Sequence, residues 1–210
     1  MIHMSEIFIE CRENGPFRVK GVKNIKDEEG NIIPAAGEHV SLCRCGKSKK
    51  KPLCDGSHRT FEFDTKNKVS EKRNIRKSYV GKKIVIHDNR KICSHAGYCV
   101  DELPSVWKKN DRPWIDPDGA SLEEIIKVIK KCPSGALSYS IENVEYRDPD
   151  IIREPEIITV AAGPYEVTGG IELKNAEWEE TASKEHYALC RCGHSENKPF
   201  CDGAHENFDF

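Results

Sequence analysis

Two stretches of the chain repeat one set of side chains that bind soft metal ions. Residues 42–58 are LCRCGKSKKKPLCDGSH, and residues 189–205 are LCRCGHSENKPFCDGAH. Each stretch holds three cysteines and one histidine in the pattern C-x-C-G-x-S-x-x-K-P-x-C-D-G-[SA]-H. A repeated set of sulfur and imidazole donors predicts a metal site in each stretch. The donors are Cys43, Cys45, Cys54 and His58 in the first stretch, and Cys190, Cys192, Cys201 and His205 in the second.

The residues between these donors are suited to position them. Gly46 and Gly193 follow the second cysteine of each stretch, and glycine lets the backbone turn so that both neighbouring cysteines reach one site. A proline stiffens the approach to the third cysteine. Asp55 predicts the N-cap of a short helix, which brings His58 near Cys54 on the same side. A helix N-terminus beside the site also favours anionic thiolates.

These stretches resemble the cluster-binding motif of the CDGSH iron–sulfur domain family, also called NEET. The resemblance implies two [2Fe–2S] clusters, the first held by Cys43, Cys45, Cys54 and His58, and the second by Cys190, Cys192, Cys201 and His205. The single departure is Ala204, which stands where the first stretch has Ser57. The resemblance also implies clusters that are redox-active, acid-labile and transferable. Acid lability agrees with histidine ligation, because protonated imidazole does not bind metal.

Disulfides and zinc are the two other interpretations of the repeated cysteines. A reducing cytosol disfavours disulfides, and cysteines in a C-x-C pair rarely bridge each other. Three cysteines and one histidine also suit tetrahedral zinc, although structural zinc sites prefer wider spacing within each cysteine pair. With zinc, the chain would be a metal-stapled interaction module.

A third group of cysteines lies between the two stretches. Cys93 and Cys99 form a C-x2-A-x2-C pattern, and Cys132 precedes a proline. The pattern resembles single-cluster bacterial ferredoxins with Ala96 in place of their middle cysteine, and in particular a divergent mono-cluster family found beside CDGSH domains. The resemblance implies a [3Fe–4S] cluster on the three cysteines. A [4Fe–4S] cluster would need a fourth ligand from His95, water or another small molecule, and three structural cysteines without a cluster remain an alternative.

Small β units are expected to carry the two repeated stretches. Alternating apolar residues predict two strands on either side of a turn at residues 14–16, followed by a polar hairpin tip at residues 26–31. Residues 156–173 echo this pattern ahead of the second stretch. Cys11, in the first predicted strand, is expected to be a buried apolar residue and not a ligand. By resemblance to the NEET homodimer, the two units are expected to pack as an intramolecular pseudo-dimer.

The middle segment is expected to mix strands and helix. Residues 83–87 and 138–141 predict strands. Ser121 and Glu124 form a capping box that predicts a helix through Lys131.

The expected fold class is therefore α+β, with two small β-rich CDGSH modules and an inserted small ferredoxin-like α+β domain. The expected domains are a first CDGSH module at 1–64, a basic linker at 65–78, the ferredoxin-like domain at 79–146 and a second CDGSH module at 147–210.

The overall composition favours small domains stapled by metal clusters. The chain has 210 residues, a formal charge of −2 and only 37% hydrophobic residues, which is a lean core for this length. A charge near zero gives no overall attraction to nucleic acid or membrane. We see no signal peptide and no apolar run long enough to span a membrane, so a cytoplasmic monomer or homodimer is expected.

The predicted function is that of an iron–sulfur protein in electron transfer, in cluster storage and transfer, or in both. We find no dinucleotide-binding or P-loop motif, and every well-patterned cysteine serves as a ligand, so no enzymatic activity is expected. The expected partner is a redox protein or a cluster acceptor, and the basic linker is one docking surface for an acidic partner. The alternatives are a zinc-stapled interaction module and a small accessory subunit of an oxidoreductase.

Overall fold

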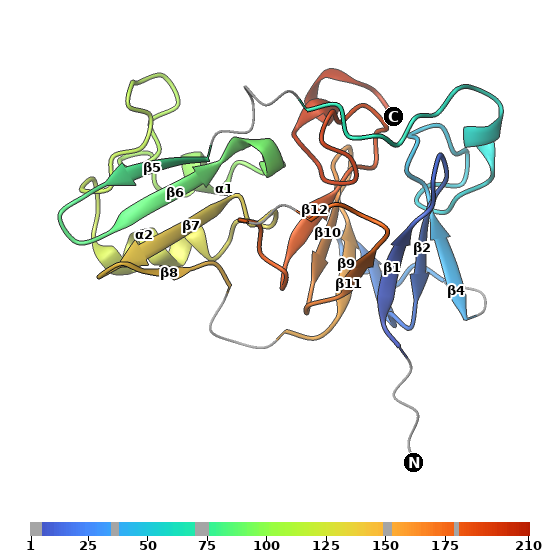
Figure 1. The fold of residues 1–210 in the computed structure, drawn as a ribbon, viewed down its shortest axis with the longest axis horizontal. Helices are drawn as coiled ribbons and strands as arrows, with labels where there is room; N and C mark the ends of the chain where they lie inside the picture. The colour runs from blue at the N-terminus through green and yellow to red at the C-terminus, as the bar shows by residue number, and fades with distance from the viewer. Residues whose placement is uncertain (1–5, 35–37, 70–75, 149–152, 179–180) are drawn as a thin grey trace, which may run out of the picture.

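The computed structural model describes residues 6–34, 38–69, 76–148, 153–178 and 181–210. Their strands form three sheets of four strands each (Figure 1). The first sheet has the order β11 (Glu172–Lys174), β1 (Phe8–Cys11), β2 (Phe17–Lys20), β4 (His39–Leu42). The second has the order β12 (Tyr187–Leu189), β10 (Tyr165–Thr168), β9 (Glu156–Thr159), β3 (Asn24–Asp27). The third has the order β5 (Arg76–Val80), β6 (Val85–Asn89), β7 (Leu137–Ile141), β8 (Val144–Tyr146).

The first two sheets exchange a strand with each other. β11 comes from the second half of the chain and pairs in parallel with β1, with Ile9 opposite Leu173. β3 comes from the first half and pairs in parallel with β9, with Ile25 opposite Ile157. The other pairs in these two sheets are antiparallel. Each half therefore completes the sheet of the other, and the strands of the described chain give the two halves the same topology.

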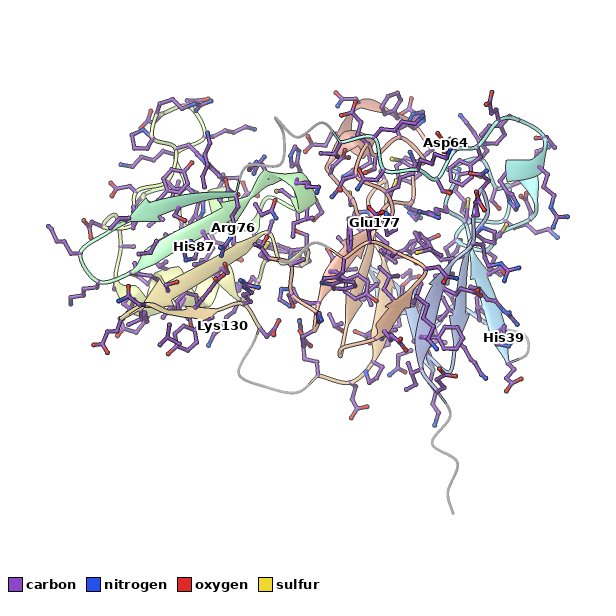
Figure 2. All side chains as sticks on the ribbon, viewed as in Figure 1. His39, Asp64, Arg76, His87, Lys130 and Glu177 are labelled. Carbon is purple, nitrogen blue, oxygen red and sulfur yellow. The ribbon has the colours of Figure 1, made fainter. Side chains whose placement is uncertain are left out.

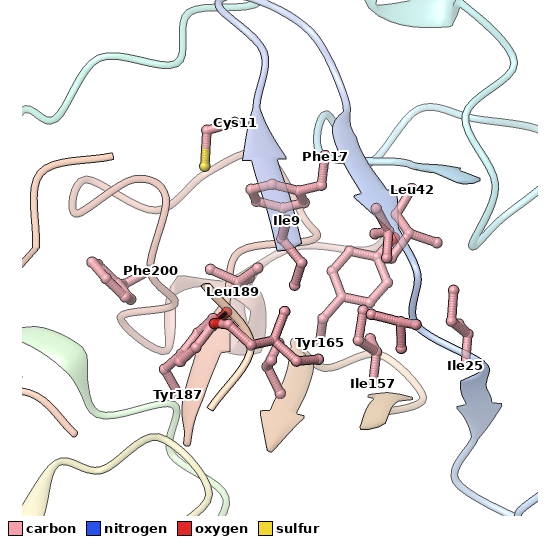
Figure 3. Packing of buried hydrophobic residues seen from close by; sticks show 14 of the residues in the cluster. Ile9, Cys11, Phe17, Ile25, Leu42, Ile157, Tyr165, Tyr187, Leu189 and Phe200 are labelled. Carbon is pink, nitrogen blue, oxygen red and sulfur yellow. Dashed lines mark hydrogen bonds between the residues drawn. The ribbon is translucent and has the colours of Figure 1, made fainter. Parts of the chain in front are cut away.

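One apolar core joins the exchanged sheets. Figure 3 shows side chains from both halves packed together, among them the fully buried Ile9, Phe17, Ile157 and Tyr165. The rings of Phe17 and Tyr165 meet edge to face with centroids 6.2 Å apart, a favoured aromatic geometry. Cys11 lies in this cluster, and burial raises the pKa of its thiol to about 11. The prediction that Cys11 is a buried apolar residue is thus confirmed.

The third sheet has its own core, covered by helices. Helix α2 (Leu122–Ile129) begins at the predicted capping box, where the hydroxyl of Ser121 accepts from the backbone N–H of Glu124. Its buried residues pack with Ile86 and Trp107, and the short helix α1 (Tyr98–Glu102) lies beside it. α2 ends at Ile129, close to the predicted end.

Several local predictions are confirmed and others are refined. β1 and β2 flank the predicted turn, and β7 matches the strand predicted at 138–141. β6 lies two residues later than the strand predicted at 83–87. No helix in the described ranges has the length and apolar character needed to cross a membrane. The segment predicted as a basic linker at 65–78 is partly structured, because β5 begins at Arg76 and residues 65–69 contact both halves. Residues 70–75 lie outside the described ranges.

Figure 1 shows how the three sheets are arranged. The sheet that carries β9, β10 and β12 lies between the third sheet and the sheet that carries β1, β2 and β4. The loops that follow β4 and β12 lie at the same end of their sheets. These loops hold the eight predicted cysteine and histidine donors of the repeated stretches.

Candidate metal centres

The first loop brings its four predicted donors together in two pairs. The Sγ atoms of Cys43 and Cys45 lie 3.8 Å apart, and Cys54 Sγ lies 3.4 Å from Nδ1 of His58. Backbone hydrogen bonds fold the loop on itself, because Cys43 N–H donates to the Pro52 carbonyl at 2.7 Å. Cys54 is half-buried, so this site reaches the surface.

The second loop repeats this geometry. The Sγ atoms of Cys190 and Cys192 are again 3.8 Å apart, and Cys201 Sγ lies 3.4 Å from Nδ1 of His205. Cys190 N–H donates to the Pro199 carbonyl at 2.9 Å, as in the first loop. Here all three cysteines are buried, so the second site is better covered than the first.

The turn that presents each histidine is a short 3₁₀-helix instead of an α-helix. The helices η1 (Ser57–Arg59) and η4 (Ala204–Asn207) each follow a glycine with positive φ, which is 87° at Gly56 and 82° at Gly203. The predicted N-cap Asp55 lies one residue earlier, but its carboxylate still accepts from the N–H groups of Ser57 and Lys49 at 2.9 and 2.8 Å. These hydrogen bonds hold the pKa of Asp55 well below its usual range and fix the loop around it.

The contact between Cys190 and Cys192 lowers the pKa of the Cys190 thiol to about 6 and raises the pKa of Cys192. Burial raises the pKa of the Cys45 thiol to about 11 and raises the pKa of Cys54. It also lowers the pKa of His58 and of His205. The histidines therefore favour the neutral form that binds metal, whereas the thiols of Cys45 and Cys54 need a nearby cation to ionise.

The two loops pack against each other across the pseudo-symmetric pair. Gly46 has a φ of 72°, and a Cβ there would overlap the carbonyl oxygen of Cys192. Gly193 has a φ of 86°, and a Cβ there would lie 2.7 Å from the carbonyl oxygen of Cys45. The sequence assigned these glycines to a local turn, and the structure shows that they also permit this close approach. The hydroxyl of Tyr165, from the second half, donates to the Cys43 carbonyl at 2.8 Å and braces the first loop.

The three middle cysteines line one cavity in the module built on the third sheet. Cys93 follows the short 3₁₀-helix η3 (Arg90–Ile92), Cys99 lies in α1, and Cys132 follows α2. Ala96 lines the same cavity, where ferredoxins would place another cysteine. Burial is the main cause that raises the pKa of Cys93 to about 12 and the pKa of Cys99 to about 11. The negative charge of a nearby Cys132 thiolate raises both pKa values further.

His95 connects this cavity to the second loop. Its Nδ1 lies 2.8 Å from a carboxylate oxygen of Glu206, and its Nε2 lies 3.0 Å from a guanidinium nitrogen of Arg90. The ring also packs on Gly203, where an added Cβ would lie 2.6 Å from it. Arg90 in turn donates to Cys93 Sγ at 3.3 Å. The middle cysteines and the second loop are thus neighbours.

Comparison with known proteins agrees with both groups of motifs. The family described as "Iron-binding zinc finger CDGSH type" matches residues 14–59 and 162–206, and the family described as "Divergent 4Fe-4S mono-cluster" matches residues 79–142. The chain belongs to the CDGSH iron–sulfur family and carries a divergent 4Fe–4S mono-cluster segment between its two CDGSH motifs.

Curated relatives match parts of this CDGSH protein. "Uncharacterized protein YjdI" of Escherichia coli K12 is 43% identical over 61 residues, which cover 29% of this chain and 80% of the relative. "CDGSH iron-sulfur domain-containing protein 2 homolog A" of Branchiostoma floridae is 51% identical over 37 residues, which cover 18% of this chain and 28% of that protein. The chain therefore spans only about a quarter of the lancelet relative.

Sequence reasoning missed Asp88, which lines the same cavity as the middle cysteines. Its side chain is 1% exposed, and neither carboxylate oxygen has a hydrogen-bond partner. The alternation of side chains along the strand could have predicted that Asp88 is buried. Ile86 and Asp88 are two residues apart on β6, so they share the face that Ile86 turns toward the core. A carboxylate on the apolar face of a strand is unusual unless something binds it.

His87 and His194 have structural contacts. His87 lies on the third sheet (Figure 2), between the hydroxyls of Ser78 at 2.8 Å and Ser140 at 2.7 Å. The ring of His194 stacks on Phe208.

Proposed function

We propose that this CDGSH protein binds two [2Fe–2S] clusters and one larger cluster, and that it acts in electron transfer, in cluster storage and transfer, or in both. The first [2Fe–2S] cluster would be held by Cys43, Cys45, Cys54 and His58, and the second by Cys190, Cys192, Cys201 and His205. The third would be held by Cys93, Cys99 and Cys132. Such clusters, when bound, supply one-electron redox chemistry, and the protein supplies ligands, orientation and dielectric.

The paired arrangement of the donors is the observation that carries this proposal. Two thiolates on one tetrahedral metal lie about 3.8 Å apart when each metal–sulfur bond is about 2.3 Å long. The Cys43–Cys45 and Cys190–Cys192 separations of 3.8 Å fit this value. Among the described residues, no three donor side chains converge on a point that suits a single metal ion. Two donors for each of two irons fit this arrangement better than one zinc ion does.

The position of the middle site supports a role in electron transfer. The contacts of His95 with Arg90 and with Glu206 place the middle cysteines next to the second CDGSH loop. The reciprocal packing of Gly46 and Gly193 places the second loop next to the first. The three proposed clusters thus belong to one continuous structure. The strand exchange supports an intramolecular pseudo-dimer with a ferredoxin-like domain inserted between its halves, which is the proposed domain organisation (1–64, 65–78, 79–146 and 147–210).

The first CDGSH site is less buried than the second, and this difference indicates where a partner binds. The first loop exposes four lysines, and none of them forms an ion pair with a described residue: Lys47, Lys49, Lys50 and Lys51. The second loop has Glu196 where the first has Lys49, and its Asn197 side chain donates to the Lys91 carbonyl of the middle module at 3.0 Å. We therefore place the docking of an acidic redox partner or cluster acceptor at the first loop. Neither nucleic acid nor membrane is part of this proposal.

The remaining parts of the proposal follow from the same chemistry. Reduced thiols and clusters suit a cytoplasmic location, and the chain is proposed to act as a monomer or homodimer without enzymatic activity of its own. A role as an accessory subunit of an oxidoreductase is the second candidate, because it needs the same sites and the same docking loop.

Electron paramagnetic resonance of anaerobically purified protein tests this function, with iron and zinc counted on the same sample. We expect a rhombic signal of reduced [2Fe–2S] centres after dithionite, and a nearly isotropic signal before reduction if the middle cluster is [3Fe–4S]. A colourless protein with stoichiometric zinc would instead establish a metal-stapled interaction module.

A further inference from the structure

Asp88 is a buried carboxylate whose charge is only partly offset, by the Trp114 indole and by the positive charges of Arg90 and Lys77. Its side chain is 1% exposed, and both oxygens lack hydrogen-bond partners. Arg90 is the nearest candidate cation in sequence, but its guanidinium contacts Cys93 Sγ and His95 and stacks on Trp114. Burial raises the pKa of Asp88 to about 6. An isolated ionised carboxylate in such a place is costly unless a metal or another partner binds it.

The cavity that Asp88 lines already holds three sulfur donors. Cys93, Cys99 and Cys132 line it together with Asp88 and Ala96. Strand alternation explains the placement, because residue 87 faces the opposite side of β6, where its ring meets two serine hydroxyls. The carboxylate and the three thiols therefore belong to one site although they come from four different segments.

Asp88 is the one acidic side chain among the residues that line this cavity, where the other oxygen donors are the hydroxyls of Ser94, Tyr98 and Ser134. Ala96 occupies the place of the ferredoxin cysteine and has no donor atom. His95 has both ring nitrogens engaged, by Glu206 and by Arg90. Carboxylate oxygen binds iron in proteins, although it is a harder ligand than thiolate.

We propose that the carboxylate of Asp88 is the fourth protein ligand of the middle cluster, which makes it a [4Fe–4S] cluster held by Cys93, Cys99, Cys132 and Asp88. This assignment rests on the proposed function, because it requires a cluster in the middle module. It replaces the alternatives of His95, water or a small molecule as fourth ligand.

The test compares full-length protein with the variants D88N and D88C after anaerobic reconstitution with ⁵⁷Fe and sulfide. Asp88→Asn keeps the shape of the side chain but removes the anionic ligand, so we expect one iron fewer per chain and the nearly isotropic signal of an oxidised [3Fe–4S] centre. Asp88→Cys supplies a thiolate, so we expect full iron content. Asp111→Ala, an exposed aspartate of the same module, is the matched control and should leave iron content and spectra unchanged.

Mössbauer spectra keep the proposal testable if D88N fails to fold. The parent protein should show one iron site with oxygen ligation, and that site should be absent from D88C. Identical spectra for the parent protein and D88C, or four irons retained by D88N, would overturn the assignment of Asp88. A parent protein with [3Fe–4S] in the middle site would also overturn it and would leave the iron–sulfur function intact. A parent protein without cluster signals would instead overturn the proposed function.

Discussion

At the scale of single residues, the histidine of each CDGSH loop is the proposed donor most sensitive to pH. Nδ1 lies 3.4 Å from the third cysteine in both loops, and burial lowers the pKa of His58 and of His205. A lowered pKa means that the neutral, metal-binding form persists as pH falls to values below that of a free imidazole, and is lost below the shifted pKa.

Replacing both histidines should therefore make the CDGSH clusters more resistant to acid. In H58C/H205C we expect the visible absorbance to survive to a pH lower by about one unit, because a metal-bound thiolate resists protonation more than imidazole does. The measurement is absorbance against pH on anaerobic protein. His39→Cys, at a histidine outside the motifs, is the control and should leave the profile unchanged. An unchanged profile in the double variant would reject histidine ligation.

His95 and Cys132 should behave differently although both line the middle cavity. In H95A the three cysteines remain, so the iron content should stay the same, and the lost hydrogen bond to Glu206 should lower stability by about 1 kcal/mol. In C132A the middle cluster should be lost and the iron content should fall. Iron analysis and thermal unfolding on the two variants check this. A fall in iron content in H95A would make His95 a ligand.

The sequence predicts donors well where a motif carries them and poorly where only tertiary structure assembles them. Cysteine and histidine spacing predicted both CDGSH donor sets, and the structure brings the members of each loop together in pairs. Sequence reasoning missed Asp88, because its place in the cavity depends on how β6 packs beside α1 and α2. The sequence did not predict the partners of His95 either, because Glu206 lies in the other module.

At the scale of elements, local sequence patterns predict where the helix lies but not which strands pair. The capping box predicted where α2 begins, because both of its hydrogen bonds are local. The parallel pairing of β3 with β9 and of β11 with β1 joins segments far apart in the chain, and no local pattern specifies such partners. The packing of Gly46 against the second loop could not be predicted from the sequence for the same reason.

Alanine at Gly46 should therefore cost more than alanine at a glycine with a similar backbone but open space. Both Gly46 and Gly30 have positive φ, so either substitution introduces strain of about 1–2 kcal/mol. Only at Gly46 does the new Cβ meet a neighbour, the Cys192 carbonyl, which should add about 1–3 kcal/mol. Denaturant unfolding of G46A and G30A measures the difference. Equal losses of stability would contradict the close packing of the two loops.

At the scale of the whole molecule, the lysines of the first loop lie at one end and another exposed lysine pair lies at the other. Lys82 and Lys83 occupy the turn between β5 and β6, at the opposite end of the molecule in Figure 1. The pair offers a matched control, because K82E/K83N changes the formal charge by the same amount as K49E/K50N. The second loop has Glu196 and Asn197 at the positions of Lys49 and Lys50, so the fold tolerates these residues there.

An acidic flavodoxin is a suitable probe of the proposed docking loop. We expect K49E/K50N to weaken its binding by about fivefold at low salt, through the loss of exposed charge pairs, and the difference should shrink as salt rises. K82E/K83N should bind as the parent protein does. Titration calorimetry at two salt concentrations measures both. Equal weakening in the two variants would show that net charge alone governs the association.

The strand exchange predicts how the first half behaves when it is separated from the rest. A fragment of residues 1–69 leaves β1 without β11, β3 without β9, and the first loop without the hydroxyl of Tyr165. The two halves share one topology, so a second copy of the fragment can supply the missing strands, with β3 of each copy beside β1 of the other. We therefore expect a homodimer, measured as mass by light scattering after size exclusion. A fragment of residues 76–148 keeps every strand of its own sheet and should be monomeric. A folded monomer of residues 1–69 would contradict the view that the exchanged strands make the two halves one structural unit.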